Sequence, residues 1–111
     1  MQPSPKPRRY ERIGLPKGMF VAWQVAGNRV VSRVATLGLG GLFIEAPHPA
    51  PAGEVIRIFF RIPGGEVRAR GTVRNSHPGK GMGVEFTSMG LEDRARLSHL
   101  LRKLLAAMPN R

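Results

Sequence analysis

The sequence predicts a small, mainly β domain: a six-stranded antiparallel β-barrel followed by one C-terminal α-helix. Short segments in which apolar and polar residues alternate are separated by Gly- and Pro-rich turns, which is the pattern of half-buried strands. From residue 91 the apolar spacing changes to that of a helix. The 111 residues suit one domain. We assign residues 18–111 to it and residues 1–17 to an N-terminal arm.

The N-terminal third predicts an arm and a hairpin. Residues 1–17 begin with closely spaced prolines and continue with arginines, so an extended basic arm is expected there. Apolar residues then alternate over residues 19–25, and β-branched residues fill residues 30–36. The turn signal Gly27-Asn28 stands between the two segments, which are therefore expected to pair as a hairpin.

A glycine-rich stretch joins this hairpin to the third strand, residues 42–45. Gly38, Gly40 and Gly41 are expected to take positive φ angles or to allow close approach of another group. The stretch is not a dinucleotide-binding fingerprint, because Phe43 stands where its third glycine is needed and a strand follows in place of a helix.

The rest of the chain predicts three more strands and a helix. Residues 55–62 and 67–74 are expected to form a hairpin with one apolar and one arginine-rich face, and Glu66 and Glu85 are the nearby acidic residues that could offset this charge. Residues 82–86 form the sixth strand. The helix from Leu91 to Pro109 should lie across a barrel mouth or a sheet face. Its apolar stripe consists of Leu97, Leu100, Leu101, Leu104, Leu105 and Met108.

The charge of the chain indicates an anionic partner. The net charge is +11, and 14 arginines outnumber 4 lysines. Such a balance favours nucleic acid, a nucleotide or an acidic surface as the partner, and the planar guanidinium suits phosphate oxygens and guanine edges. With no cysteine, no signal peptide and no apolar run of membrane-spanning length, we expect a cytoplasmic protein without membrane insertion.

Catalysis is not expected. His48, His77 and His99 each lack a second histidine or a carboxylate at ligand spacing, so no metal site is predicted. No pair of nucleophile and base can be assembled either. The sequence therefore predicts neither catalytic residues nor a cofactor.

Two motifs and the order of the elements resemble the PilZ domain, a bacterial receptor module for the second messenger cyclic di-GMP. The Arg-x-x-x-Arg motif of that family matches Arg8 and Arg12 on the arm, with Arg9 as an additional neighbour. Its Asp/Asn-x-Ser-x-x-Gly motif aligns with residues 36–41. The resemblance continues through Leu42-Phe43-Ile44 and residues 81–86 to Glu92-Asp93-Arg94, and so covers nearly the whole chain.

The resemblance implies a split-barrel fold and a signalling function. Ligand binding would order the arm, and a downstream effector protein would read that change. Thr36 stands in place of the Asp/Asn of the second motif and Gly38 in place of its Ser, while Gly41 matches. The implied ligand-binding residues are Arg8, Arg9, Arg12, Thr36, Gly38 and Gly41.

Two alternatives stay open. Because the second motif departs from the family pattern, the chain could be a PilZ-like adaptor that binds protein without ligand, through the apolar helix stripe or the face bearing Phe59. A small nucleic-acid-binding barrel is less favoured, because Phe59 is the one clear stacking platform on its arginine face. That face comprises Arg57, Arg61, Arg68, Arg70 and Arg74.

Overall fold

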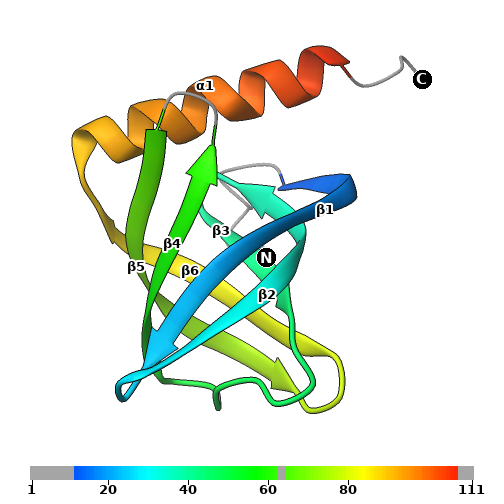
Figure 1. Ribbon diagram of the computed structural model, residues 1–111, viewed down its shortest axis with the longest axis vertical. Coiled ribbons are helices and arrows are strands. Elements are labelled where there is room, and N and C mark those ends of the chain that lie inside the picture. The colour runs from blue at the N-terminus through cyan, green and yellow to red at the C-terminus, as the bar shows by residue number, and fades with distance from the viewer. Residues whose placement is uncertain (1–11, 63–64, 108–111) are drawn as a thin grey trace, which may run out of the picture.

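A computed structural model gives the structure of the protein and describes residues 12–62 and 65–107 (Figure 1). Six strands close into an antiparallel barrel in the order β1-β2-β3-β6-β5-β4, and one helix follows them. The predicted fold class is confirmed. The elements are β1 (Arg12–Val25), β2 (Asn28–Gly38), β3 (Gly41–Glu45), β4 (Val55–Ile62), β5 (Gly65–His77), β6 (Gly81–Met89) and α1 (Leu91–Ala107).

The alternation of each strand sorts its side chains between the core and the outer surface. In β4, Ile56, Ile58 and Phe60 are buried while Arg57 and Arg61 are exposed, because successive side chains of a strand point to opposite faces. β1 closes the barrel by pairing with β4, with Trp23 across from Ile58. The core is continuous inside the closed barrel, and its largest fully buried side chains include Leu37, Leu42, Ile44, Ile56, Ile58, Met82 and Leu97.

The hairpin of β1 and β2 turns one residue earlier than the sequence predicts. Val25 pairs with Asn28, so Asn28 is the first residue of β2. The two connecting residues, Ala26 and Gly27, have φ angles of 52° and 86°. Two successive positive φ angles give the type I′ geometry that matches the twist of a two-residue hairpin.

β1 also begins earlier than expected. Its pairing with β2 extends to Arg12, which lies across from Gly38, so residues 12–17 of the predicted arm belong to the strand. The register shifts between Gly14 and Met19, in a segment that contains Pro16, whose backbone lacks the N–H donor that a regular ladder needs. Residues 1–11 of the predicted arm, with Arg8 and Arg9, lie outside the described residues.

Helix α1 lies across one end of the barrel, as Figure 1 shows. Leu97 and Leu101 are buried in the core, and Leu100 and Leu104 are half-buried against it. The apolar stripe is narrower than predicted, because Leu105 is 49% exposed; Met108 lies outside the described residues.

Two polar contacts fasten the start of the helix to β5. The Arg96 guanidinium donates through Nη1 to the carbonyl oxygen of Glu66 at 3.3 Å. The backbone N–H of Arg68 donates to Asp93 Oδ1 at 3.1 Å. Asp93 stands in the first turn of α1, where a carboxylate also favours the helix dipole.

One buried hydrogen bond links β1 to β2 inside the core. Trp23 Nε1 donates to Ser32 Oγ at 2.9 Å, and the two residues are 3% and 7% exposed. Ser32 is the buried polar residue among the described residues. Because a buried N–H without an acceptor is costly, Ser32 makes it possible for the indole to point into the barrel.

Replacing Ser32 by Ala should lower the free energy of unfolding by about 1–3 kcal/mol, since the buried indole N–H loses its acceptor. Urea denaturation followed by circular dichroism measures this loss. In a Trp23→Phe background the Ser32→Ala change should cost less, because no donor is left unsatisfied. Equal costs in both backgrounds would contradict a stabilising role for the hydrogen bond.

Candidate ligand-binding site at the glycine turn

Strand pairing brings distant parts of the sequence together at residues 38–41, which we call the glycine turn. Arg12 is the cross-strand partner of Gly38, and Gly14 is the partner of Thr36. Gly41 opens β3, which runs back along β2. Four of the predicted site residues, Arg12, Thr36, Gly38 and Gly41, therefore lie around one junction of three strands.

The glycine turn is held tightly against β6. The Phe86 N–H donates to the carbonyl oxygen of Gly40 at 2.8 Å, and Gly41 pairs with Glu85. Gly38 and Gly41 are buried. Among the described residues, positive φ occurs at other glycines and not at these, so of the two roles expected for them only close approach of another group remains.

Thr36 faces the outer surface because β2 contains a bulge just before it. Val34 pairs with Ile44 and Thr36 with Phe43, so Ala35 is an extra residue with no partner on β3. Phe43 lies between Leu42 and Ile44, which both point into the core, and therefore points outward together with its partner Thr36. The Thr36 hydroxyl is thus half-buried on the outside of the barrel, beside the first residues of β1.

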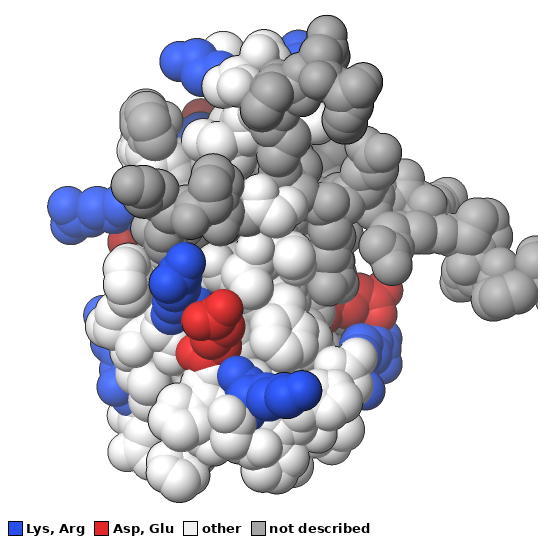
Figure 2. Space-filling view, turned by 90° about the vertical axis from the view of Figure 1, so that its right-hand side faces the viewer, with Lys and Arg blue, Asp and Glu red and all other residues white. Residues whose placement is uncertain are grey.

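The side of the molecule on the right of Figure 1 is seen in Figure 2. Its described residues present separated basic groups, and the acidic groups in view lie beside basic ones (Figure 2). On this side the described residues therefore form no broad basic patch. Part of the net charge of +11 therefore lies outside the described surface seen in Figure 2.

Comparison with known proteins agrees with this arrangement of strands. The model of the PilZ domain family matches residues 6–103. The chain belongs to the PilZ domain family. No curated protein sequence matches the chain.

Several solved structures show the same fold. The chain is similar to the motility inhibitor MotI/DgrA of Bacillus subtilis, with a TM-score of 0.75 and 19% identity over 94% of this chain and 54% of that one. It is similar to MrkH of K. pneumoniae in complex with cyclic di-GMP, with a TM-score of 0.74 and 16% identity over 91% and 53%. The PilZ domain of Escherichia coli YcgR with cyclic di-GMP gives a TM-score of 0.73 and 16% identity over 91% and 93%. The chain thus spans about half the length of the MotI/DgrA and MrkH structures.

The arginine-rich outer face of this PilZ domain is divided by its acidic residues. Arg68 Nε lies 3.2 Å from Glu66 Oε1, and Arg74 Nε lies 2.6 Å from Glu85 Oε1, so the two predicted acidic neighbours do offset part of the charge. Arg57 and Arg70 differ: they lie directly across from each other in the β4–β5 ladder. Neither has an acidic partner among the described residues.

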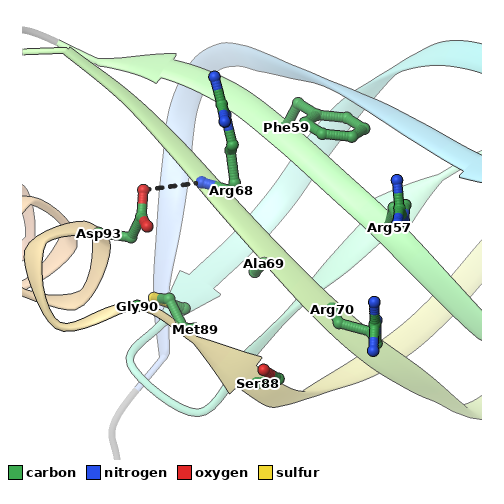
Figure 3. A pocket seen from close by; sticks show the side chains of 9 residues that line it. All are labelled: Arg57, Phe59, Arg68, Ala69, Arg70, Ser88, Met89, Gly90 and Asp93. Atoms are coloured by element: carbon green, nitrogen blue, oxygen red, sulfur yellow. Dashed lines mark hydrogen bonds between the residues drawn. The ribbon is translucent and has the colours of Figure 1, made fainter.

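A hollow of about 370 Å³ lies beside this arginine pair on the outside of β4, β5 and β6 (Figure 3). It is lined by Arg57, Phe59, Arg68, Ala69, Arg70, Ser88, Met89, Gly90 and Asp93. Sequence reasoning missed this hollow, because only the strand register shows which arginines face each other and which face acids. It also missed the cation–π contact in which the Arg29 guanidinium lies 4.6 Å from the centre of the Phe59 ring.

Two further findings concern the described residues as a whole. No three His, Asp or Glu side chains among them are grouped so as to hold a metal ion. Within the same residues, no helix has both the length and the apolar character to cross a membrane.

The division of the arginine face predicts opposite effects of two matched substitutions. Arg74→Gln should lower the free energy of unfolding by at most about 1 kcal/mol, since an exposed ion pair contributes little. Arg57→Gln should instead raise it by about 0.2–1 kcal/mol at low salt, because it removes the repulsion of a directly opposed like charge.

Urea denaturation in a phosphate-free buffer measures both changes. The difference between the two variants should shrink in 1 M salt, where charges are screened within about 3 Å. Destabilisation by Arg57→Gln equal to that by Arg74→Gln would show that the opposed arginines do not repel.

Proposed function

We propose that this PilZ domain is a receptor for cyclic di-GMP, which binds beside the glycine turn and is held by Arg8, Arg9 and Arg12. The observation that carries the proposal is the register of β1 against β2, in which Arg12 is the partner of Gly38. The two motif segments implied to bind ligand thus adjoin in space. Similarity of fold to the cyclic di-GMP complexes of YcgR and MrkH supports the same ligand.

The chemistry of these residues suits the ligand. Cyclic di-GMP carries two phosphates and two guanines, and arginine can donate paired hydrogen bonds both to phosphate oxygens and to guanine O6 and N7. The Thr36 hydroxyl faces the outer surface, where it can donate or accept one hydrogen bond. Gly38 offers only its backbone, so the turn supplies fewer contacts than the Asp/Asn and Ser of the family motif would.

Signalling follows from the arm in this proposal. Arginines that meet a dianionic ligand fix the segment that carries them, and ordering of a basic segment on an anion is a general way to change a protein surface. A partner protein in the cytoplasm would read the new arrangement of the arm. The proposal involves no chemical step, because the ligand is bound and released unchanged.

The adaptor remains the second candidate, and one observation favours a surface for it. Phe20 and Val31 are 59% and 67% exposed. Val31 pairs with Ala22, two residues from Phe20 on the same face of β1, so the two apolar side chains lie near each other outside the barrel. The apolar helix stripe is a poorer adaptor surface, because Leu97 and Leu101 pack in the core.

Removal of both motif arginines should abolish ligand binding. Calorimetric titration of the full chain with cyclic di-GMP is expected to give micromolar or tighter binding, with GTP as the control ligand. Arg8→Ala/Arg12→Ala should weaken it at least about 100-fold, since each charge-assisted hydrogen bond is worth about 1.5–3 kcal/mol.

Arg29→Ala/Arg33→Ala is the matched control, because it removes two arginines at the same spacing from the exposed part of β2. This control should bind as the unmodified chain does. Equal losses in the two double variants would refute a specific clamp. No heat and no shift in melting temperature with the unmodified chain would favour the adaptor.

Restoring the family residue in the turn should tighten binding. Thr36→Asn replaces a hydroxyl with one donor by an amide with two N–H donors and a carbonyl acceptor, at a position that faces outward and is only half-buried. The same titration should give an affinity about tenfold higher, the effect of one added hydrogen bond of about 1–1.5 kcal/mol. Thr36→Val removes the hydroxyl and should have the opposite effect. If neither substitution alters the affinity, the turn does not contact the ligand.

A further inference from the structure

We propose that the hollow on β4, β5 and β6 is a second ligand site, separate from the glycine turn, and that it takes a single nucleotide with one phosphate and one base. The hollow has a charged end, an apolar floor and an acidic end, all contributed by described residues (Figure 3). The inference goes beyond the cyclic di-GMP proposal and does not depend on it.

The positive end consists of Arg57 and Arg70. As cross-strand partners, their Cβ atoms are about 4.5–5.5 Å apart, and like charges in this position repel. Two other arginines on the face are paired with acids: Arg68 with Glu66 and Arg74 with Glu85. Arg57 and Arg70 thus carry positive charge without an acidic partner, beside arginines that have one. A bound phosphate would offset this charge and accept hydrogen bonds from both guanidinium groups.

The floor of the hollow offers a surface for a flat ring. Phe59, Ala69 and Met89 contribute its apolar part. The Arg29 guanidinium packs on the Phe59 ring at 4.6 Å but does not line the hollow. Phe59 itself lines the hollow, and the contact with Arg29 helps to hold its ring in place. An aromatic ring held in one position is a good stacking partner for a base.

The opposite end carries a carboxylate. Asp93 accepts through Oδ1 from the backbone N–H of Arg68. Arg68 precedes Arg70 by two residues on β5, so this contact lies about 7 Å along the strand from Arg70. The same Oδ1 lies 3.8 Å from Arg96 Nη1, whereas Oδ2 can accept from the amino and imide N–H groups of a base. Phosphate acceptors at one end and N–H donors at the other are the two polar ends of a nucleoside monophosphate.

A single nucleotide fits better than a nucleic-acid strand. The acids beside Arg61, Arg68 and Arg74 interrupt the basic face on either side of the hollow, so successive phosphates would find no continuous track. The volume of about 370 Å³ lies at the lower end of small-molecule sites, which span roughly 300–1,000 Å³.

Titration of the full chain with 5′-GMP in phosphate-free buffer tests the proposal. Binding should be at least tenfold tighter for 5′-GMP than for ribose 5-phosphate, which lacks the base. Arg57→Gln/Arg70→Gln should weaken 5′-GMP binding at least tenfold, whereas the control Arg74→Gln should leave it unchanged. Phe59→Leu should reduce the affinity for 5′-GMP to that for ribose 5-phosphate. Melting curves check that each variant is folded.

Four results would overturn the proposal. They are no binding of 5′-GMP, an equal loss in Arg74→Gln, equal affinity for the two probes, and much tighter binding of a single-stranded oligonucleotide that also depends on Arg57 and Arg70. Cyclic di-GMP separates the two sites. Its affinity should survive Arg57→Gln/Arg70→Gln and fall in Arg8→Ala/Arg12→Ala. The reverse pattern would make the hollow the sole nucleotide site and would contradict both assignments.

Discussion

The register of β1 is the constraint on which the rest of the structure depends. β1 lies between β2 and β4, and Gln24 pairs with Arg29 on one side and Arg57 on the other. Because side chains alternate with a period of two, a slip by one residue would turn every core side chain outward. The buried bond from Trp23 to Ser32 fixes the same register from inside. The register of β1 thus closes the barrel and places Arg12 across from Gly38 at the glycine turn.

Most of the fold prediction rested on the alternation of apolar and polar residues and on the Gly- and Pro-rich turns between strands. The apolar period of residues 55–62 and the change of period at residue 91 are local properties, and both are confirmed as β4 and α1. What the sequence could not supply depends on contacts between distant segments. Pairing with β2 extends β1 back to Arg12, and the shape of the barrel end leaves Leu105 exposed. Neither follows from propensity.

Prediction of the candidate sites was limited in the same way, because it too depends on contacts between distant segments. Arg-x-x-x-Arg occurs at four places in the sequence, and in a strand this spacing puts both arginines on one face wherever it occurs. The partners across the ladder distinguish even the two arginines of one copy: Arg57 lies across from Arg70, whereas Arg61 lies across from Glu66. The ligand-binding roles of Arg8 and Arg12 come from resemblance to the family and stay predictions. The contact of Asp93 with β5 likewise depends on the fold, since Arg68 lies 25 residues away in the sequence.

β6 connects the two regions physically. Near its middle, the Phe86 N–H bonds to Gly40 of the glycine turn, and two residues later Ser88 pairs with Arg70 beside the hollow. Glu85 pairs with Gly41 in one ladder and binds Arg74 with its side chain. The strand that supports the glycine turn therefore also supplies the carboxylate that pairs with Arg74 on the neighbouring strand. The positive charge left at Arg57 and Arg70 is thus a consequence of barrel register, and arginine content alone does not account for it.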